Sequence, residues 1–415
     1  MSRSKDMQEF DHVIIGGGLA GGNAAISIRE NDSKCSILLI TDENHLPYDR
    51  VPLSKNYLYG KMPKEALYMK KMDFYNAQKI QILSGKSVVS LDANRKLISL
   101  EDKSQIHFRN LLLATGGHVR HLDIPGTNLK NVFYLRTIED SEAIKEMIQT
   151  AKNGVVIGGG FIGCELASTF AKKAISTTII EAGSKILGRV FDSDTASWLE
   201  SYFTRKGVKI MTKTMPLECI GSNGKVTGVR LQSGEIIPAD FVVIGIGINP
   251  NVELAKNAGL QVDNGIIVNE YMQTSNPDIY AVSDVARFYS PVFGRHMRLE
   301  HYDLAVKQGR LAGENMTRKT KPFEDLPYFF SFMFDVRIEV YGDMSKYDTV
   351  ITRGIPIENG NFTKFYLDSG IVNAVMMVTR KENVESIKQL IRLRKKIDNP
   401  ASLGNESDKI EAIIT

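Results

Sequence analysis

The stretch Val13-Ile14-Ile15-Gly16-Gly17-Gly18-Leu19-Ala20-Gly21-Gly22 decides the fold. It begins as an apolar strand, turns through glycines and enters a helix-forming run, Asn23 to Arg29. Gly16, Gly18 and Gly21 stand at the spacing of a dinucleotide-binding turn. One glycine permits the turn, one lets a pyrophosphate approach bare backbone, and one lets helix and strand pack closely. The N–H groups at the helix start are then free to hold phosphates.

Two acidic residues follow the next predicted strand. The apolar run Ser36 to Ile40 ends at Thr41-Asp42-Glu43, about twenty residues beyond the last glycine of the turn. An acid at this distance accepts a hydrogen bond from a ribose hydroxyl of the dinucleotide. Asp42 and Glu43 are therefore both candidates for that contact.

Length and composition favour a multidomain globular protein. The 415 residues exceed what one core accommodates, while 43% hydrophobic and 24% charged residues are ordinary values. A net charge of +4 is far from a nucleic-acid footprint. No apolar run approaches the ~18 residues of a membrane helix, and the polar start, Met1 to Gln8, does not resemble a signal peptide. Three dispersed cysteines suit a reducing compartment, so we expect a cytoplasmic protein.

A second glycine fingerprint repeats the first further along the chain. Its glycines, between a predicted strand and a helix, are Gly158, Gly160 and Gly163. The next strand, Thr177 to Ile180, ends in Glu181. Two fingerprints predict two dinucleotide sites in one chain. Glu181 favours NADH, because a carboxylate accepts from the 2′-hydroxyl and repels a 2′-phosphate, although nearby Lys185 leaves NADPH as the less favoured alternative.

Further candidate site residues lie in one loop and at strand ends. The loop Leu46 to Lys55 holds two prolines and presents Arg50 and Lys55 to an anion; a surface loop with two solvated cations is the alternative. Another buried strand ends in the small residues Ala114-Thr115-Gly116, which suit a close cofactor approach. Asp284 ends a later strand, over the crevice where open α/β sheets bind ligands, and is also suited to capping a following helix.

In combination these motifs resemble the two-dinucleotide flavoprotein reductases. The resemblance rests on the two fingerprints and on the segments Ala114-Thr115-Gly116-Gly117, Gly245-Ile246-Gly247 and Ala281-Val282-Ser283-Asp284. The loop Leu46 to Lys55 is similar to that of the ferredoxin reductases that serve aromatic-ring dioxygenases. Glu300-His301-Tyr302-Asp303 and the run Gly309 to Thr317 are closer still to the apoptosis-inducing-factor branch.

The resemblance implies an α/β fold of the glutathione-reductase type. Its two Rossmann-like domains are an FAD-binding domain in two parts, residues 1–120 and 251–325, and an inserted NAD(H)-binding domain, residues 121–250. A C-terminal α+β domain, residues 326–415, completes the expected arrangement.

The resemblance also implies roles for single residues. Lys55 and Glu165 match a pair that meets beside flavin N5, where a cation stabilises the negative charge that develops during hydride transfer, and are the expected catalytic residues. Phe330 stands where relatives carry a tryptophan beside the flavin. The FAD contacts implied are Gly16, Gly18, Leu19, Ala20, Gly21, Asp42, Glu43, Arg50, Lys55, Val88, Ala114, Thr115, Gly116, Arg136, Asp284, Glu300, His301, Tyr302 and Phe330. The NADH contacts implied are Gly158, Gly160, Phe161, Ile162, Gly163, Glu181 and Gly247.

Thiol and metal chemistry are not expected. Flavoprotein disulfide reductases of this architecture carry two cysteines facing the flavin, and the related peroxidases carry one, whereas the loop Tyr48 to Lys55 has none. Cys164, inside the second fingerprint, is interpreted as a small core residue. The seven histidines are dispersed and predict no metal site.

The sequence thus predicts an FAD-dependent enzyme that takes a hydride from NADH. Its expected acceptor is a small acidic iron–sulfur protein, a ferredoxin or rubredoxin. The alternatives are an NADH oxidase that forms hydrogen peroxide, a quinone reductase, or an NADH redox sensor of the apoptosis-inducing-factor type. Neither nucleic acid nor a transmembrane segment is expected, and a homodimer is compatible with the sequence.

Overall fold

The structure is a computed structural model that describes residues 8–317, 319–357 and 360–414, so the predicted absence of a signal peptide at Met1 to Gln8 falls almost wholly outside it. The described chain divides into two compact units. The first unit contains Met1–Asp49, Lys64–His118 and Asn249–Asp325, and the second contains Arg50–Pro63, Val119–Ile248 and Leu326–Thr415. The division of the chain into FAD-binding, NAD(H)-binding and C-terminal domains stays a prediction.

The first unit is built on a sheet of seven described strands in the order β3-β2-β1-β6-β5-β4, with β18 beside β6. The strands β1, β2, β3, β6 and β18 pair in parallel, whereas β5 pairs antiparallel with both β4 and β6. Val13 and Ile14 of β1 have no exposed surface, as expected for a central parallel strand covered on both faces. The strands are β1 Gln8–Ile15, β2 Ile37–Ile40, β3 Ile80–Leu83, β4 Val88–Asp92, β5 Leu97–Leu100, β6 Gln105–Leu113 and β18 Ile279–Ala281.

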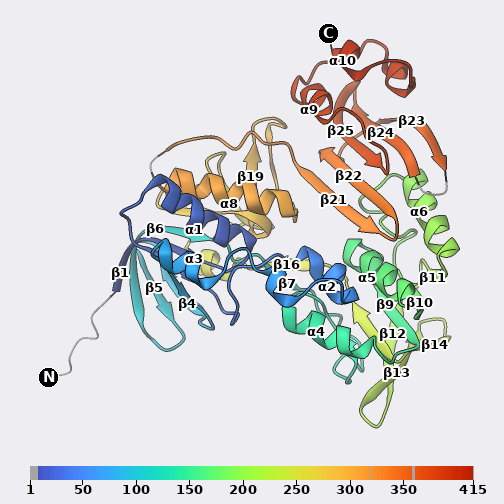
Figure 1. Cartoon of the computed structure of the whole chain (residues 1–415), viewed down its shortest axis with the longest axis horizontal. Coiled ribbons are helices and arrows are strands. Elements are labelled where there is room, and N and C mark those ends of the chain that lie inside the picture. The colour runs from blue at the N-terminus through green and yellow to red at the C-terminus, as the bar shows by residue number, and fades with distance from the viewer. Residues whose placement is uncertain (1–7, 318, 358–359, 415) are drawn as a thin grey trace. The chain divides into compact units, whose positions relative to one another are not determined.

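Two helices of the first unit, far apart in sequence, lie side by side in Figure 1: α1 Leu19–Asn31 and α8 Tyr302–Met316. A Cβ on Gly309 would lie 2.4 Å from the carbonyl oxygen of Ala20, and one on Gly313 would lie 2.6 Å from that of Ala24. The run quoted for the apoptosis-inducing-factor branch therefore lets two helices pack backbone to backbone. The remaining elements are α3 Met72–Ala77, α7 Glu253–Asn257, β17 Ile266–Val268, β19 Ala286–Ser290 and β20 Arg295–Met297.

The second unit repeats the same plan around five described parallel strands in the order β11-β10-β9-β15-β8. The repeat extends to the glycine turn: Gly16 donates its N–H to Ile40 O at 2.8 Å, and Gly158 donates to Ile180 O at 2.8 Å. The strands are β8 Val132–Phe133, β9 Asn153–Ile157, β10 Ser176–Ile180, β11 Val208–Met211 and β15 Phe241–Ile244. A flanking sheet contains β12 Pro216–Ser222, β13 Lys225–Leu231 and β14 Ile236–Pro238.

Residues 50–63 belong to the second unit because its helices hold their backbone. Thr169 donates to Ser54 O at 2.8 Å, and Ser141 donates to Leu53 O at 2.8 Å. The helices are α2 Asn56–Tyr59, α4 Ile138–Met147, α5 Phe161–Lys172 and α6 Ser193–Arg205. The short strands β7 Gly117–Val119 and β16 Ile248–Pro250 pair where the chain passes between units.

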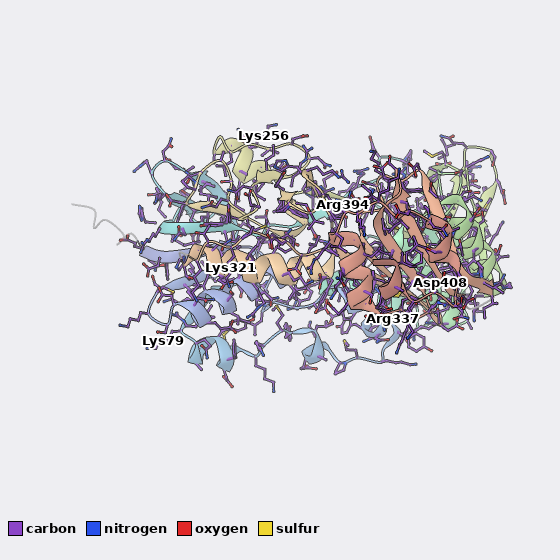
Figure 2. The ribbon with its side chains drawn as sticks, turned by 90° about the horizontal axis from the view of Figure 1, so that it is seen from above. Lys79, Lys256, Lys321, Arg337, Arg394 and Asp408 are labelled. Carbon is purple, nitrogen blue, oxygen red and sulfur yellow. The ribbon has the colours of Figure 1, made fainter. Side chains whose placement is uncertain are left out.

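The C-terminal part is an antiparallel sheet, orange to red in Figure 1, with the order β21-β22-β25-β24-β23. Its strands are β21 Tyr328–Met333, β22 Val336–Gly342, β23 Thr349–Ile357, β24 Gly360–Asp368 and β25 Ile371–Val378. The helices α9 Val384–Arg392 and α10 Ile410–Ile414 follow. Arg394, labelled in Figure 2, lies just after α9 and donates to Asn373 Oδ1 of β25 at 2.7 Å. In the described chain no helix is both long and apolar enough to cross a membrane.

A buried ion pair joins α6 to the C-terminal sheet. Asp192, the N-cap of α6, accepts from Lys364 Nζ at 2.6 Å and from Tyr366 Oη at 2.7 Å. Burial opposes ionisation of Asp192, but the hydrogen bonds from Lys364, Thr195 and Tyr366 outweigh it and lower the pKa to about 2. An aspartate in the unfolded chain has a pKa of about 3.9, so this carboxylate stabilises the folded protein.

Asp192→Asn is therefore expected to lower the free energy of unfolding by about 3 kcal/mol, because Lys364 is left buried without a counter-charge. The stabilisation by Asp192 is complete above about pH 4 and is lost as the pH falls toward 2, so the variant should lose less stability over that range. Urea unfolding at several pH values measures both effects. Asp194→Asn, at an exposed position in the same helical turn, is the control; equal acid sensitivity of all three proteins would contradict the assignment.

Candidate dinucleotide and flavin site

The first glycine turn sits between the ends of three strands. Gly16 has φ +117°, and a Cβ there would lie 2.2 Å from the carbonyl oxygen of Ala114, the residue after β6. A Cβ on Gly21 would lie 2.0 Å from Gly16 O. Only glycine fits these two places, whatever the site holds. The second turn is built alike, since a Cβ on Gly158 would lie 2.4 Å from Gly245 O and one on Gly163 1.9 Å from Gly158 O.

The middle glycine of each fingerprint is different. Around Gly18 and Gly160 no atom lies within 4 Å of where a Cβ would stand. Both are helix N-caps in extended backbone, with φ near −80°, which any residue adopts. Among the glycines that the structure describes, these two combine open space with an unstrained backbone. Neither steric crowding nor backbone strain requires glycine there, whereas a dinucleotide phosphate drawn close to the helix N–H groups would.

The structure separates the two candidate acids of the first unit. Glu43 Oε2 accepts from Tyr48 Oη at 2.6 Å, so this carboxylate anchors the loop that follows. Asp42 is exposed, and within the described residues its side chain makes no hydrogen bond. Asp42 is therefore the better placed of the two for a ribose hydroxyl.

Glu181 in the second unit directly follows β10, and its carboxylate is hydrogen-bonded to the second glycine turn. Its Oε2 accepts from Gly159 N at 2.6 Å, and its Oε1 accepts from Gly183 N at 2.6 Å. Each carboxylate oxygen can accept a further donor, so a ribose hydroxyl is still accommodated. Lys185, the cation that left NADPH open, lies 3.8 Å from Glu200 and is drawn to that carboxylate.

The small residues after β6 are clamped by a residue that sequence reasoning missed. Asn251 Nδ2 donates to Thr115 O at 2.8 Å, Thr115 Oγ1 donates to Asn251 O at 2.9 Å, and Asn251 N donates to Gly116 O at 3.0 Å. His118 Nδ1 lies 2.6 Å from Asn251 Oδ1. The segment Ala114-Thr115-Gly116 is thus held rigidly against the turn at Gly16. The Asn249-Pro250-Asn251 sequence offered only a turn signal for this.

Asp284 lies in a short 3-10 turn after β18, beside the start of α8. The segment that follows is β19, so Asp284 does not cap a helix as the sequence also allowed. Gln308 Oε1 of α8 accepts from Ser283 N at 2.8 Å and fixes this turn, a contact that sequence reasoning missed. Burial lowers the pKa of His301 to about 4, against the opposing charge of Asp284. Glu300 pairs with Arg298 Nη1 at 2.8 Å.

A charged pair lies buried in the second unit. Lys55 Nζ is 2.6 Å from Glu165 Oε2, and their side chains are 17% and 5% exposed. Ser54 Oγ donates to the same oxygen at 2.6 Å, and Ser331 Oγ donates to Oε1 at 2.7 Å. The pair that the resemblance implied is therefore formed, with two serines that sequence reasoning missed.

The other predicted site residues of the second unit are spread over several elements. Arg50 Nη1 donates to Arg136 O at 2.8 Å, which brings these two arginines together. Gly247 has φ +103° and its carbonyl accepts from Arg120 N at 2.9 Å. Phe330 lies on the face of β21 opposite Ser331, in a row with Tyr328 and Phe332. Val88, in the first unit, is half-buried at the start of β4.

The three cysteines are buried and none is in a disulfide. Burial raises the pKa of Cys35 and of Cys219 to about 11, and raises that of Cys164 further, with Glu165 and Glu181 adding to the effect. A thiolate is the reactive form, so these side chains are packing residues.

Comparison with known proteins shows which family this chain belongs to. Residues 10–309 match the pyridine nucleotide-disulphide oxidoreductase family, and residues 328–414 match the family described as Reductase C-terminal. The chain belongs to the pyridine nucleotide-disulphide oxidoreductases. It is an FAD-dependent NAD(P)H oxidoreductase of the ferredoxin reductase type, and it lacks the cysteine pair for which the family is named.

The sequences of individual relatives align with this reductase over most of their length. Putidaredoxin reductase of Pseudomonas putida is 38% identical over 97% of this chain and 96% of the relative. Rubredoxin-NAD(+) reductase of the same species is 34% identical, covering 82% of this chain and 88% of its own length. The crystal structure of a covalent putidaredoxin reductase–putidaredoxin complex matches with a TM-score of 0.93 at 38% identity, over 98% of both chains.

Proposed function

We propose that this reductase takes a hydride from NADH and passes the electrons to a small acidic iron–sulfur protein of the ferredoxin or rubredoxin type. The observation that carries the proposal is the pair of open glycines, Gly18 and Gly160, which provides for two dinucleotides in one chain. FAD, when bound, accepts two electrons together and releases them singly, which suits a one-electron acceptor. Relatives named for putidaredoxin and rubredoxin support a protein acceptor. The buried cysteines, without disulfides, suit the cytoplasm.

The residues of the first unit fit the adenine dinucleotide part of FAD. Gly18 leaves room for the pyrophosphate, the N–H groups of Leu19 and Ala20 begin a helix of thirteen residues, and Asp42 offers a free carboxylate to the ribose. Asp284 would accept from the ribitol, beside a neutral His301.

Lys55 is proposed to act on the flavin ring with Glu165 as its partner. The ammonium is the pair's positive charge, and preorganised charge stabilises the negative charge that develops in hydride transfer. The Glu165 carboxylate holds that ammonium at a fixed place, since it is itself held by two serine hydroxyls. Both side chains are largely shielded from water, which strengthens the interaction.

Glu181 is proposed to select NADH over NADPH. Glu181→Ala should reduce the preference for NADH, measured as the ratio of kcat/KM for the two cofactors, by roughly tenfold, because repulsion of the 2′-phosphate is lost. Glu181→Gln is the informative partner variant, since its amide oxygen can still accept from Gly159 or Gly183 while its charge is gone. An unchanged preference in both variants would remove Glu181 from the ribose site.

The acceptor is tested by anaerobic stopped-flow mixing with NADH, followed in parallel by oxygen or by a ferredoxin. Rapid bleaching of the flavin, slow reaction with oxygen and fast reoxidation by ferredoxin are expected. Fast reoxidation by oxygen alone would make the protein an oxidase. Slow reduction with a persistent long-wavelength band would make it a redox sensor.

A further inference from the structure

Strand β21 of the C-terminal sheet packs along helix α5 within the second unit, and successive residues of the two elements are in contact. Near the start of the helix, the rings of Phe161 and Phe329 meet edge to face at 5.2 Å. Glu165, four residues after Phe161 on the helix, accepts a hydrogen bond from Ser331, two residues after Phe329 on the strand. Four helical residues rise about 6 Å and two strand residues about 6.6 Å, so the two elements stay in register.

Beyond Glu165, helix α5 contacts the turn that follows β21. Ser168 Oγ accepts from Phe334 N at 2.6 Å, and Lys172 Nζ donates to Phe334 O at 2.8 Å. One stripe of α5 is therefore fastened to β21 and the turn after it. Ser331 itself is fixed from the other side, because its backbone pairs with Ile338 of β22.

Ser331 makes a contact to Glu165 that nothing else replaces. Within the described residues its hydroxyl is the donor to Oε1, whereas Ser54 and Lys55 both engage Oε2. Ser331 is only 1% exposed, so bulk water does not reach its hydroxyl. The two oxygens of Glu165 are thereby distinguished: one belongs to the C-terminal sheet and the other to Lys55.

We propose that Ser331 is a positioning residue for the Lys55–Glu165 pair. By holding Oε1, its hydroxyl prevents the carboxylate from turning both oxygens toward the ammonium. Without it, a two-pronged pairing would draw the Lys55 charge toward Glu165 and leave less of it for the flavin. The inference rests on the proposed role of Lys55. Through Ser331, the C-terminal sheet takes part in positioning Lys55 and Glu165.

Ser331→Ala should slow flavin reduction by NADH about tenfold in anaerobic stopped-flow, with the Kd for NADH unchanged, because a hydrogen bond to a charged group is lost. The two-electron reduction potential of the bound FAD should become more negative. A tenfold change in the equilibrium constant for flavin reduction corresponds to about 30 mV. Ser331→Thr, which keeps the hydroxyl, should restore both values. Ser331→Cys, a weaker donor of similar volume, should lie between and remains informative if the alanine variant does not fold.

The matched control is Ser386→Ala. Ser386 Oγ donates to Glu411 Oε1 at 2.7 Å, so the same kind of bond is removed elsewhere in the C-terminal part. Its reduction rate and potential should equal those of the parent protein. A double-mutant cycle of Ser331→Ala with Glu165→Gln, read by urea unfolding of the FAD-loaded protein, should show coupling of the two residues.

Three results would overturn the proposal in different ways. Normal reduction rate and potential in Ser331→Ala, alongside slow reduction in Lys55→Ala, would remove Ser331 and leave the proposed function standing. Normal reduction in Lys55→Ala would remove both. A slowed Ser331→Ala protein that the threonine variant does not rescue would also count against the hydroxyl.

Discussion

Gly18→Val is expected to give a folded protein without FAD. Valine fits the empty protein, because no atom lies within 4 Å of its Cβ and the backbone at Gly18, φ −79° and ψ −172°, is an ordinary extended one. Stability should fall by at most about 1 kcal/mol, the scale of a changed N-cap. The side chain would occupy the place of the pyrophosphate. Losing two charge-assisted hydrogen bonds of about 2 kcal/mol each weakens FAD roughly 1,000-fold.

Gly160→Val provides the matched experiment in the second fingerprint. It stands at the same N-cap position with the same open surroundings, φ −80° and ψ −171°. This variant should purify with FAD bound but should be reduced only at far higher NADH concentrations. The flavin absorbance of the purified protein and the Kd for NADH measure the two effects. FAD retained in Gly18→Val, or lost from Gly160→Val, would contradict the assignment of the two sites.

Lys55→Met is expected to keep FAD and to lower the limiting rate of flavin reduction roughly 100-fold, the usual cost of removing one preorganised charge or donor. The Kd for NADH should change little, because Lys55 acts on developing charge rather than on the bound cofactor. Stability should also fall by about 3 kcal/mol, since Glu165 is left buried without its cation.

The partner variant Glu165→Gln separates the effect on the rate of flavin reduction from the effect on stability. It removes the negative charge but keeps an amide for Ser54 or Ser331, so Lys55 is freed from its ion pair. The double variant should be no slower than Lys55→Met, because the two residues act as one unit. Lys61→Ala removes a cation of the same unit that lies over the Tyr59 ring, and should leave the rate unchanged. A limiting rate in Lys55→Met close to that of the parent would exclude Lys55 from hydride transfer.

Much of the site was predictable because its signals are local. Glycine spacing, a buried strand before it and an acid after the next strand are properties of short segments, and both turns form as predicted. The pairing of Lys55 with Glu165 was predictable only through resemblance, since nothing in their spacing brings them together. The sequence left Asp42 and Glu43 equivalent, and the hydrogen bond from Tyr48 to Glu43 distinguishes them.

The sequence by itself determined the fold class, the two dinucleotide turns and the absence of a cysteine from the loop Tyr48 to Lys55. The tertiary structure alone decided which distant side chains meet: Ser331 on Glu165 and Asn251 on Thr115 in the candidate site, and Lys364 on Asp192 outside it. The physical reason is that such contacts depend on the register between elements. A strand repeats about every 6.6 Å and a helix turns about every 5.4 Å, so which residues meet is set only when the elements pack.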